Sequence, residues 1–320
     1  MSDTKPVAYV TRMHTDAVMA AFAVHFDLIL NAGDTQRSAD ELLRGMHSCD
    51  VMVPIVTDSF DDALLRQGPF RARLIANVGV GTNHIDLAAA ARAGIVVTNT
   101  PDVLTDDTAD IAIALMLMAT RRLGEAERLV RDNRWHGLAP THHLGHALRG
   151  RTLGVIGYGR IGRAVAERAR TFGLKVQWLG RAGGAAKPDQ EMAPSLDALL
   201  ASSDIISLHA PATPATTHLM NAARIAQMRP GSILINTARG SLVDEQALAA
   251  ALLSGHLFAA GLDVHEREPQ ITPALMTLEN VVLLPHLGSA TVETRTAMGL
   301  RALDNALQFL SGRPPQDRVI

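Results

Sequence analysis

Short apolar runs alternate with longer amphipathic segments along most of the chain. An apolar run that ends at turn residues is typical of a buried strand, whereas apolar residues three and four positions apart indicate a helix. Alternation of the two is typical of parallel sheets covered by helices. In the first third of the chain the pattern predicts strands at 7–11, 26–30, 51–56, 74–77 and 95–98, with helices at 16–23, 38–47, 59–66 and 87–93.

The pattern changes after residue 98, where the sequence TPDVLTDD interrupts it. A single long helix is predicted at 108–133, and Asp106 and Asp107 lie beside its N-terminus, where negative charge is favoured. Alternation then resumes. The remaining predicted strands are 153–156, 176–179, 205–209, 232–236, 259–264 and 281–284, with helices at 161–172, 195–201 and 291–310.

A glycine-rich turn, LGVIGYGRIG, joins the predicted strand at 153–156 to the helix that follows it. Gly157 allows a tight turn, Gly159 lets the backbone approach a pyrophosphate, and Gly162 lets helix and strand pack closely. The helix N-terminus adds N–H groups and partial positive charge. This context favours a dinucleotide site over an ordinary strand–helix turn. A second stretch, NVGVGTNHID, has a histidine where a third glycine belongs and is not interpreted as a nucleotide site.

The end of the next strand bears on which nicotinamide dinucleotide is used. NAD-binding units usually place an acidic residue about 20 residues beyond the glycines, where it binds the ribose 2′-hydroxyl. Here Leu179 is followed by Gly180 and Arg181, with no acid. Because Arg181 can pair with a 2′-phosphate, the sequence favours NADP(H) over NAD(H). The alternative, that Arg181 is a solvated loop residue, stays open.

The glycine-rich turn lies near the middle of the chain rather than at its start. We therefore predict an α/β fold with two Rossmann-like or flavodoxin-like domains, each built on a parallel sheet. Residues 1–101 and 288–320 would form a discontinuous substrate-binding domain, and residues 102–287 an inserted dinucleotide-binding domain. Ligands of such sheets bind beyond the C-terminal ends of the strands.

Composition excludes several other classes. The chain has 320 residues, of which 47% are hydrophobic and 19% charged, and this excludes a disordered protein. A formal net charge of −2 gives no electrostatic footprint for nucleic acid or an anionic membrane. The single cysteine, Cys49, excludes an internal disulfide and is typical of a reducing compartment. Since we find no signal peptide and no apolar stretch long enough to span a bilayer, we expect a cytoplasmic protein.

Three residues late in the chain are candidates for the chemistry: Arg239, Glu268 and His286. Arginine can hold a carboxylate through two parallel, charge-assisted hydrogen bonds. Histidine can donate a proton to an oxygen at neutral pH, and a nearby carboxylate can orient it and favour its charged form. Downstream of a dinucleotide site, these residues indicate reduction of the keto group of a 2-oxo acid. Taken alone, each could instead be structural.

Several motifs occur in order along almost the whole chain, and the chain resembles the D-isomer-specific 2-hydroxyacid dehydrogenases because of them. They are NVGVGTNHID, NTPDVLTDDTAD, GYGRIG, HAPATPAT, INTARGSLVDEQAL, GLDVHEREP and LLPHLGSAT. Within that family the chain is most similar to the glyoxylate/hydroxypyruvate reductases, which prefer NADPH, with the 2-ketogluconate reductases close behind. The resemblance implies a homodimer joined through the nucleotide domains.

The resemblance also implies roles for individual residues. Arg239 would clamp the substrate carboxylate, and His286 would protonate the developing alkoxide as hydride reaches the keto carbon. Glu268 would bind the imidazole of His286. Glu266 is the competitor for this role, and Glu268 is preferred because the family pattern places the glutamate directly before a proline, here Pro269.

Further positions match residues that bind substrate or line the cofactor in the family. The backbone amides of Val80 and Gly81 would hold the substrate carboxylate a second time. Asp263 would serve the nicotinamide side of the cofactor, although a strand-end aspartate that holds a turn is an equal alternative. The remaining cofactor positions are Arg160, Ile161, Pro211 and Thr237.

Three histidines, His142, His143 and His146, raise the question of a metal site. Neither a cysteine nor a carboxylate lies near them in the sequence, and this kind of hydride transfer needs no metal, so no metal site is predicted. The stretch 135–146 is instead a candidate lining of the pocket mouth, within the subunit or from a partner.

Three functions compete at this point. The favoured one is reduction of glyoxylate and hydroxypyruvate by NADPH. An enzymatic alternative is an NAD-linked 3-phosphoglycerate dehydrogenase, against which stand the missing acid after Leu179 and the lack of a regulatory tail beyond Ile320. The non-enzymatic alternative is a nucleotide-sensing corepressor, but the long disordered tail expected of one is lacking.

Overall fold

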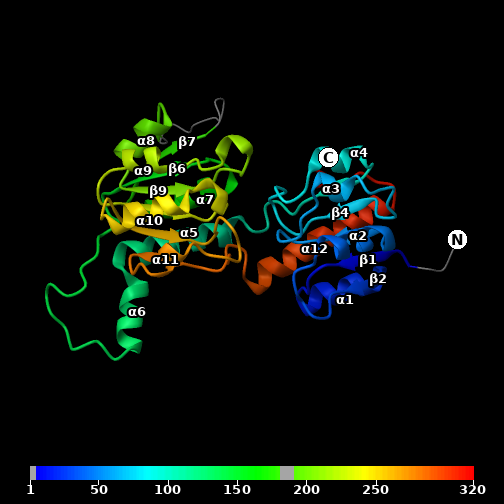
Figure 1. Cartoon of the computed structure of the whole chain (residues 1–320), viewed down its shortest axis with the longest axis horizontal. Coiled ribbons are helices and arrows are strands. Elements are labelled where there is room, and N and C mark those ends of the chain that lie inside the picture. The colour runs from blue at the N-terminus through cyan, green and yellow to red at the C-terminus, as the bar shows by residue number, and fades with distance from the viewer. Residues whose placement is uncertain (1–4, 181–190) are drawn as a thin grey trace. The chain divides into compact units, whose positions relative to one another are not determined.

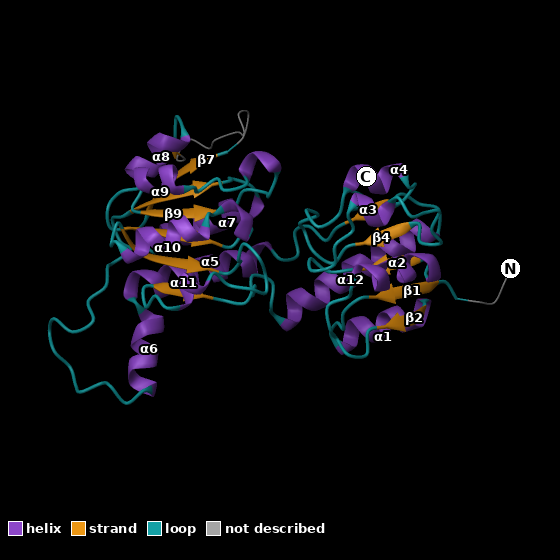
Figure 2. Ribbon diagram, viewed as in Figure 1, coloured by secondary structure: helices purple, strands orange, loops and turns teal. Residues whose placement is uncertain are grey.

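The computed structural model describes residues 5–180 and 191–320. The chain divides into two compact units, Met1–Leu104 with Ala290–Ile320, and Thr105–Ser289, so the second unit is inserted into the first (Figure 1). Each unit contains a parallel sheet with helices packed on it (Figure 2). The predicted α/β fold with two Rossmann-like domains is confirmed.

The sheet of the first unit has the strand order β2-β1-β3-β4-β5, the order of flavodoxin-like sheets. The parallel strands are β1 (Val7–Val10), β2 (Asp27–Leu30), β3 (Val51–Val53), β4 (Leu74–Ala76) and β5 (Val96–Thr98). The helices are α1 (Asp16–His25), α2 (Ala39–Ser48), α3 (Asp62–Leu65), α4 (Leu87–Arg92) and α12 (Val292–Leu310). Since α12 packs on α1 and β4, the two segments of this unit share one core.

Capping side chains set where these helices begin. Ser38 accepts the backbone N–H of Glu41, and the Glu41 carboxylate accepts the N–H of Ser38 in return, which forms a capping box at the start of α2. Asp61 caps α3 in a similar way, so that helix begins at Asp62 rather than at the expected residue 59.

The sheet of the second unit has the order β12-β11-β10-β9-β6-β7-β8. Counted from β6, this is the Rossmann order with one further strand at the β12 edge. The strands are β6 (Thr152–Ile156), β7 (Lys175–Leu179), β8 (Glu191–Met192), β9 (Ile205–Leu208), β10 (Ser232–Asn236), β11 (Leu257–Leu262) and β12 (Val281–Leu283). The helices are α5 (Thr105–Arg121), α6 (Leu123–Arg131), α7 (Arg160–Thr171), α8 (Leu196–Ser202), α9 (Ala222–Gln227), α10 (Glu245–Leu253) and α11 (Pro273–Met276).

Strand β10 shows how both faces of this sheet are filled. Ile233 and Ile235 join the core that contains residues of α5 and α7, whereas Leu234 joins the core that contains residues of α8, α9 and α10. Every residue of β10 is buried. A strand buried on both faces is a continuous apolar run in the sequence, which is why this element could be predicted.

The single long helix predicted at 108–133 is wrong. Two helices, α5 and α6, occupy this stretch, and Arg122 between them has a φ of 54°. A left-handed residue cannot continue a right-handed helix. The carbonyl of Thr120, which a continuous helix would use internally, accepts the backbone N–H of His146 instead. Within the second unit, α6 and the loop after it extend away from the sheet (Figure 1).

The apolar stretch within residues 109–120 lies in α5, which packs against β10 and β11. Among the residues that the structure describes, no helix is both long enough and apolar enough to cross a membrane.

Candidate active site

Five neighbouring strands of the second unit end along one edge of the sheet. They are β12, β11, β10, β9 and β6. Because the strands are parallel, the residues that follow them meet at this edge. They are Gly157 after β6, His209 after β9, Thr237 after β10, Asp263 after β11 and His286 after β12. Most of the catalytic and cofactor-binding residues predicted in this unit therefore lie at the edge formed by the C-terminal strand ends.

The glycine-rich turn has the contacts expected of a dinucleotide cradle. Gly157 has a φ of 96°, and a Cβ there would lie 2.5 Å from the backbone nitrogen of Ala210. A Cβ on Gly162 would lie 2.2 Å from the carbonyl oxygen of Gly157. A Cβ on Gly159 would meet nothing within 4 Å. The first and third glycines are thus required by packing, whereas Gly159 faces open space, which leaves its backbone open to a ligand.

The start of α7 fits an anion. Gly159 is its N-cap and has no side chain to satisfy the first N–H groups of the helix, and Arg160 is its first residue. Ile161 packs against the core beneath α7. Backbone N–H groups and the helix dipole at such an end attract phosphate.

The other predicted cofactor residues differ in their surroundings. Thr237 is buried, and its hydroxyl has no hydrogen-bond partner among the described residues, so it can bind a ligand atom. Gly180 directly follows β7 and is packed against the ring of Trp178. Pro211 is exposed two residues after His209. Arg181 lies outside the described residues.

Arg239 lies in the turn between β10 and a short 3₁₀ helix, η2 (Gly240–Leu242). Asn236 shapes this turn, because its side chain donates to the carbonyl of Arg239 at 2.8 Å and accepts the N–H of Ala238 at 3.0 Å. Burial lowers the pKa of the Arg239 guanidinium, and the charge of Glu268 acts in the opposite direction. A largely buried cation therefore lies within electrostatic range of the Glu268 carboxylate.

His286 and Glu268 are in direct contact. Nδ1 of His286 lies 2.8 Å from Oε2 of Glu268, so Nδ1–H donates to the carboxylate and Nε2 is the ring nitrogen left to face a substrate. The other carboxylate oxygen accepts the backbone N–H of His265 at 2.9 Å. Burial would raise the pKa of Glu268, but the hydrogen bonds and charge of His286 and the His265 N–H outweigh it and lower that pKa. Glu268 therefore stays ionised at neutral pH.

Asp263 holds the turn that contains His286. Its carboxylate accepts the backbone N–H groups of Leu287 at 2.7 Å and Gly288 at 2.8 Å, and its carbonyl accepts the N–H of His286. His286 has a φ of 58°, which is unusual for a residue other than glycine. Burial raises the pKa of Asp263, although the two N–H groups act against it. Both carboxylate oxygens of Asp263 thus bind the backbone of the turn. This is the structural role that the sequence left open as an alternative to a cofactor contact.

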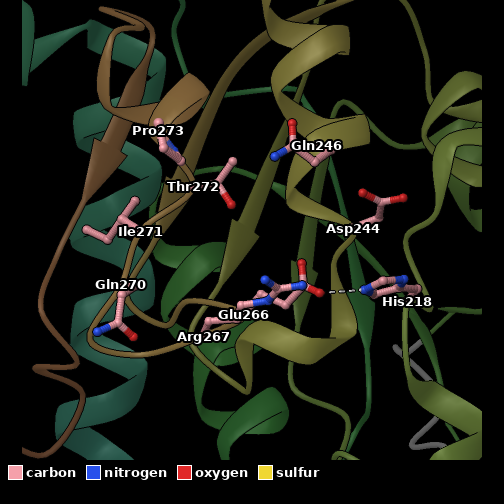
Figure 3. A pocket seen from close by; sticks show the side chains of 9 residues that line it. All are labelled: His218, Asp244, Gln246, Glu266, Arg267, Gln270, Ile271, Thr272 and Pro273. Carbon is pink, nitrogen blue, oxygen red and sulfur yellow. Dashed lines mark hydrogen bonds and ion pairs between the residues drawn. The ribbon is translucent and has the colours of Figure 1, made fainter.

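Glu266, the competitor for the role of Glu268, contacts a different histidine. Its Oε1 lies 3.0 Å from Nε2 of His218, and the two side chains point toward one another (Figure 3). The pair lies at a pocket of about 380 Å³ whose other lining residues are Asp244, Gln246, Arg267, Gln270, Ile271, Thr272 and Pro273. Arg239, Glu268 and His286 do not line this pocket, so the His218–Glu266 pair is separate from the His286–Glu268 pair.

A close backbone contact joins the Arg239 turn to the loop that carries Glu268. A Cβ on Gly240 would lie 1.9 Å from the carbonyl carbon of His265 and 2.4 Å from the nitrogen of Glu266. Only glycine allows this approach. The structure therefore brings Arg239, Glu268 and His286 together through three loops that follow β10, β11 and β12.

In the first unit, Val80 and Gly81 lie in the loop after β4. Asn99 donates to the carbonyl of Val80 at 2.9 Å, and Asn77 donates to the carbonyl of Gly81 at 3.1 Å. Across a trans peptide the N–H points opposite to the carbonyl, so the Val80 carbonyl contact fixes the direction of the Gly81 N–H.

Sequence reasoning missed several residues that shape the site: Asn236, Glu245 and His265. Glu245 and His265 are both buried, at 2% and 6% exposure. Charged residue types at fully buried positions are rare unless they are paired, but burial cannot be seen in the sequence. Only Asn236 had a signal in the sequence, because it ends the apolar run of β10.

Of the three clustered histidines, His142 and His143 contact one another through their rings, whose centroids are 5.9 Å apart. Nε2 of His143 contacts the carbonyl of Arg122 at 3.0 Å, and its Nδ1 lies 3.6 Å from Glu125. His146 packs against the ring of Phe258. No group of three or more histidine, cysteine or acidic residues that could hold a metal ion is found in residues 5–180 and 191–320.

The chain is similar to known proteins over almost its whole length. Residues 113–288 match the family model described as D-isomer specific 2-hydroxyacid dehydrogenase, NAD binding domain. A glyoxylate reductase from Thermococcus litoralis is 40% identical over 321 residues, which cover 98% of this chain and 97% of the relative.

Solved structures are similar over both units. A glyoxylate reductase from Paecilomyes thermophila has a TM-score of 0.86 at 32% identity and covers 99% of each chain. An NADPH-dependent glyoxylate/hydroxypyruvate reductase from Sinorhizobium meliloti, in complex with NADP and malonate, has a TM-score of 0.88 at 35% identity, covering 99% of this chain and 97% of that one.

Proposed function

Because the chain belongs to the family of D-isomer-specific 2-hydroxyacid dehydrogenases, we propose that it reduces small 2-oxo acids, with glyoxylate and hydroxypyruvate foremost, to 2-hydroxy acids. The contact between His286 Nδ1 and Glu268 Oε2 carries this proposal. It leaves Nε2 of an imidazole, held by an ionised carboxylate, available to a substrate oxygen close to the guanidinium of Arg239.

In the proposed reaction the keto carbon gains a hydride and the keto oxygen gains a proton. A 2-oxo acid, a reduced nicotinamide and a proton thus become a 2-hydroxy acid and an oxidised nicotinamide. The dinucleotide, when bound, supplies the hydride. Arg239 binds the substrate carboxylate through two N–H groups. His286 donates the proton from Nε2, and Glu268 orients the imidazole. In the reverse direction His286 accepts the proton.

The nicotinamide dinucleotide is assigned to the turn at Gly157, Gly159 and Gly162, to the start of α7 and to the hydroxyl of Thr237. The open space at Gly159 and the unpartnered Thr237 hydroxyl support this assignment. Val80 and Gly81 in the first unit are proposed as a second contact for the substrate carboxylate. Asp263 is assigned chiefly to holding the His286 turn, because both of its oxygens are used there.

NADP(H) is proposed as the preferred dinucleotide, with NAD(H) as the alternative. Gly180 and Arg181 follow β7, and the acid that would bind a ribose 2′-hydroxyl is missing. The similar reductase from Sinorhizobium meliloti is NADPH-dependent. Other substrates within the family, 2-ketogluconate and 3-phosphohydroxypyruvate, remain the enzymatic alternatives, and a nucleotide-sensing corepressor the non-enzymatic one.

A homodimer is part of the proposal. Along α6 and the loop after it, five large apolar side chains are exposed: Leu123 (44%), Val130 (58%), Trp135 (54%), Leu138 (93%) and Leu144 (62%). Several exposed large apolar side chains on one segment of the chain are typical of an interface. A cytoplasmic location is also proposed, since the one cysteine, Cys49, is buried and free.

Steady-state assays with a panel of 2-oxo acids and both reduced dinucleotides test the function. We expect turnover of glyoxylate and hydroxypyruvate with NADPH, slower turnover with NADH, and weak turnover of 3-phosphohydroxypyruvate. A preference for 3-phosphohydroxypyruvate with NADH would favour the phosphoglycerate alternative. Tight dinucleotide binding without turnover of any 2-oxo acid would favour the corepressor alternative.

A further inference from the structure

His265 is a buried histidine in the loop that carries Glu268. Its Nε2 lies 2.9 Å from the carbonyl oxygen of Leu284, so this nitrogen carries a hydrogen and donates it. Its Nδ1 faces Oε1 of Glu245 at 3.8 Å, a contact too long for a hydrogen bond but close for two charges. Both side chains are 3% exposed.

The same residue also contacts Glu268. The backbone N–H of His265 donates to Oε1 of Glu268 at 2.9 Å, while Oε2 of Glu268 accepts from His286. Leu284 directly follows β12 and lies two residues before His286. His265 thus binds the Glu268 carboxylate with its backbone N–H. With its ring it binds the chain segment that precedes His286.

Glu245, at the start of α10, completes the arrangement. Its Oε1 accepts the backbone N–H of Glu266 at 2.9 Å, and its Oε2 accepts the hydroxyl of Thr272. Burial would raise the pKa of Glu245, but His265, Thr272 and the Glu266 N–H outweigh it and lower that pKa to about 2. Burial opposes a charge on His265, yet Glu245 and the Leu284 carbonyl raise its pKa. Glu245 therefore anchors both ends of the loop, at residues 266 and 272, and favours a charged His265.

We propose that His265 is a positioning residue for the reduction, which fixes the distance between His286 and Glu268 by binding Leu284 with its imidazole and Glu268 with its backbone N–H. The inference rests on the proposed function, because it gives His265 a task only if His286 is the proton donor. Loss of the ring bond would remove the side-chain link between Leu284 and the Glu268 loop, and leave the contacts of Asp263 with the His286 turn and the His286–Glu268 contact.

Two variants at His265 and one control separate positioning from simple packing. His265→Phe fills a similar space without a ring N–H, whereas His265→Gln keeps an N–H that can reach the Leu284 carbonyl. The matched control is His256→Phe. His256 Nε2 also contacts a carbonyl, that of Ile225 at 3.0 Å, but His256 precedes β11 at the opposite end of the strand.

We expect His265→Phe to lower kcat about 10-fold or more, since a misplacement of about 1 Å can cost about 100-fold in rate. His265→Gln should restore kcat to within about 3-fold of wild type, and neither variant should change the dissociation constant of NADPH by more than about 2-fold. His256→Phe should leave kcat unchanged. Equal kcat losses in His265→Phe and His265→Gln, or no loss in His265→Phe, would overturn the proposal.

A second measurement needs no substrate. The Nδ1 proton of His286, bonded to Glu268, is identified in NMR spectra by its absence in His286→Gln. This signal should broaden or disappear in His265→Phe and persist in His265→Gln. An unchanged signal in His265→Phe would count against positioning. Absence of turnover by the wild-type protein with every 2-oxo acid would instead contradict the proposed function, whatever the NMR signal shows.

Discussion

The carboxylate of Glu268 accepts the Nδ1 proton of His286 across 2.8 Å, and this contact fixes which ring nitrogen can serve a substrate. His286→Gln removes the titrating group but keeps a polar side chain. General acid catalysis typically contributes about 100- to 10,000-fold, so we expect kcat to fall by at least about 100-fold. The dissociation constant of NADPH, measured by fluorescence titration, should change little because His286 lies beyond the dinucleotide turn. A loss of only twofold in kcat would refute the role of His286.

The His286–Glu268 and His218–Glu266 pairs provide a matched comparison. Glu268→Gln should lower kcat by about 10- to 100-fold, because the imidazole of His286 loses the carboxylate that orients it. Glu266→Gln removes the negative charge that faces His218, a pair that does not involve His286, and should leave kcat within about 2-fold of wild type. The reverse ranking of the two variants would assign the active carboxylate to Glu266.

The sequence could predict the central strands of the sheets because these strands are buried on both faces. The β10 segment reads SILIN, an almost unbroken apolar run, and the structure forms a strand over the predicted residues 232–236. The end of α5 could not be predicted in this way. Arg122 is neither glycine nor proline, and the helix breaks there because a distant residue, His146, takes the carbonyl of Thr120.

The candidate site was accessible to sequence reasoning only in part. Order and spacing of motifs single out Arg239, Glu268 and His286, but choosing between Glu266 and Glu268 required a resemblance to a family. Which histidine each glutamate contacts depends on how the loop folds back over Gly240. The roles of Glu245 and His265 depend on burial, which arises only when α10, β11 and β12 pack together.

Cofactor preference can be tested at Arg181. If its guanidinium pairs with a 2′-phosphate, Arg181→Ser loses a charge-assisted hydrogen bond worth about 1.5–3 kcal/mol. We then expect kcat/KM for NADPH to fall about 10- to 100-fold while kcat/KM for NADH stays within about 2-fold. Parallel losses with both dinucleotides would show that Arg181 does not discriminate between them.

Stability of the first unit should depend on pH through Asp317. Its carboxylate accepts hydrogen bonds from Arg301 at 2.5 and 2.8 Å and from Asn305 at 3.0 Å. These contacts outweigh burial and lower the pKa of Asp317 in the folded chain. Asp317 therefore stabilises the folded chain at pH values above its pKa in the unfolded chain. This stabilisation is lost as pH falls through the lower pKa that Asp317 has in the folded chain.

Asp317→Asn tests this linkage. At pH 7 we expect the variant to lower the free energy of unfolding by about 1–3 kcal/mol, because a buried charge-assisted bond is lost. The difference from wild type should shrink as urea denaturation is repeated at pH values from 5 down to 3. A difference that is constant over this range would mean that the ionisation of Asp317 does not contribute.

Gly240 tests whether the close approach of two loops is needed for the site. In Gly240→Ala the new methyl group would lie 1.9 Å from the carbonyl carbon of His265, so the backbone of the Glu268 loop must move away from the Arg239 turn. We expect overpacking to lower the free energy of unfolding by about 1–3 kcal/mol. Since a shift of about 1 Å can cost about 100-fold in rate, we also expect kcat to fall at least about 10-fold.

Gly124→Ala in α6 is the matched control, because its Cβ would be 3.5 Å from the flexible end of Arg128 and its helix tolerates alanine. Urea denaturation and kcat, measured on both variants, separate the two effects. Wild-type kcat in a folded Gly240→Ala protein would show that Arg239 and Glu268 act without this contact.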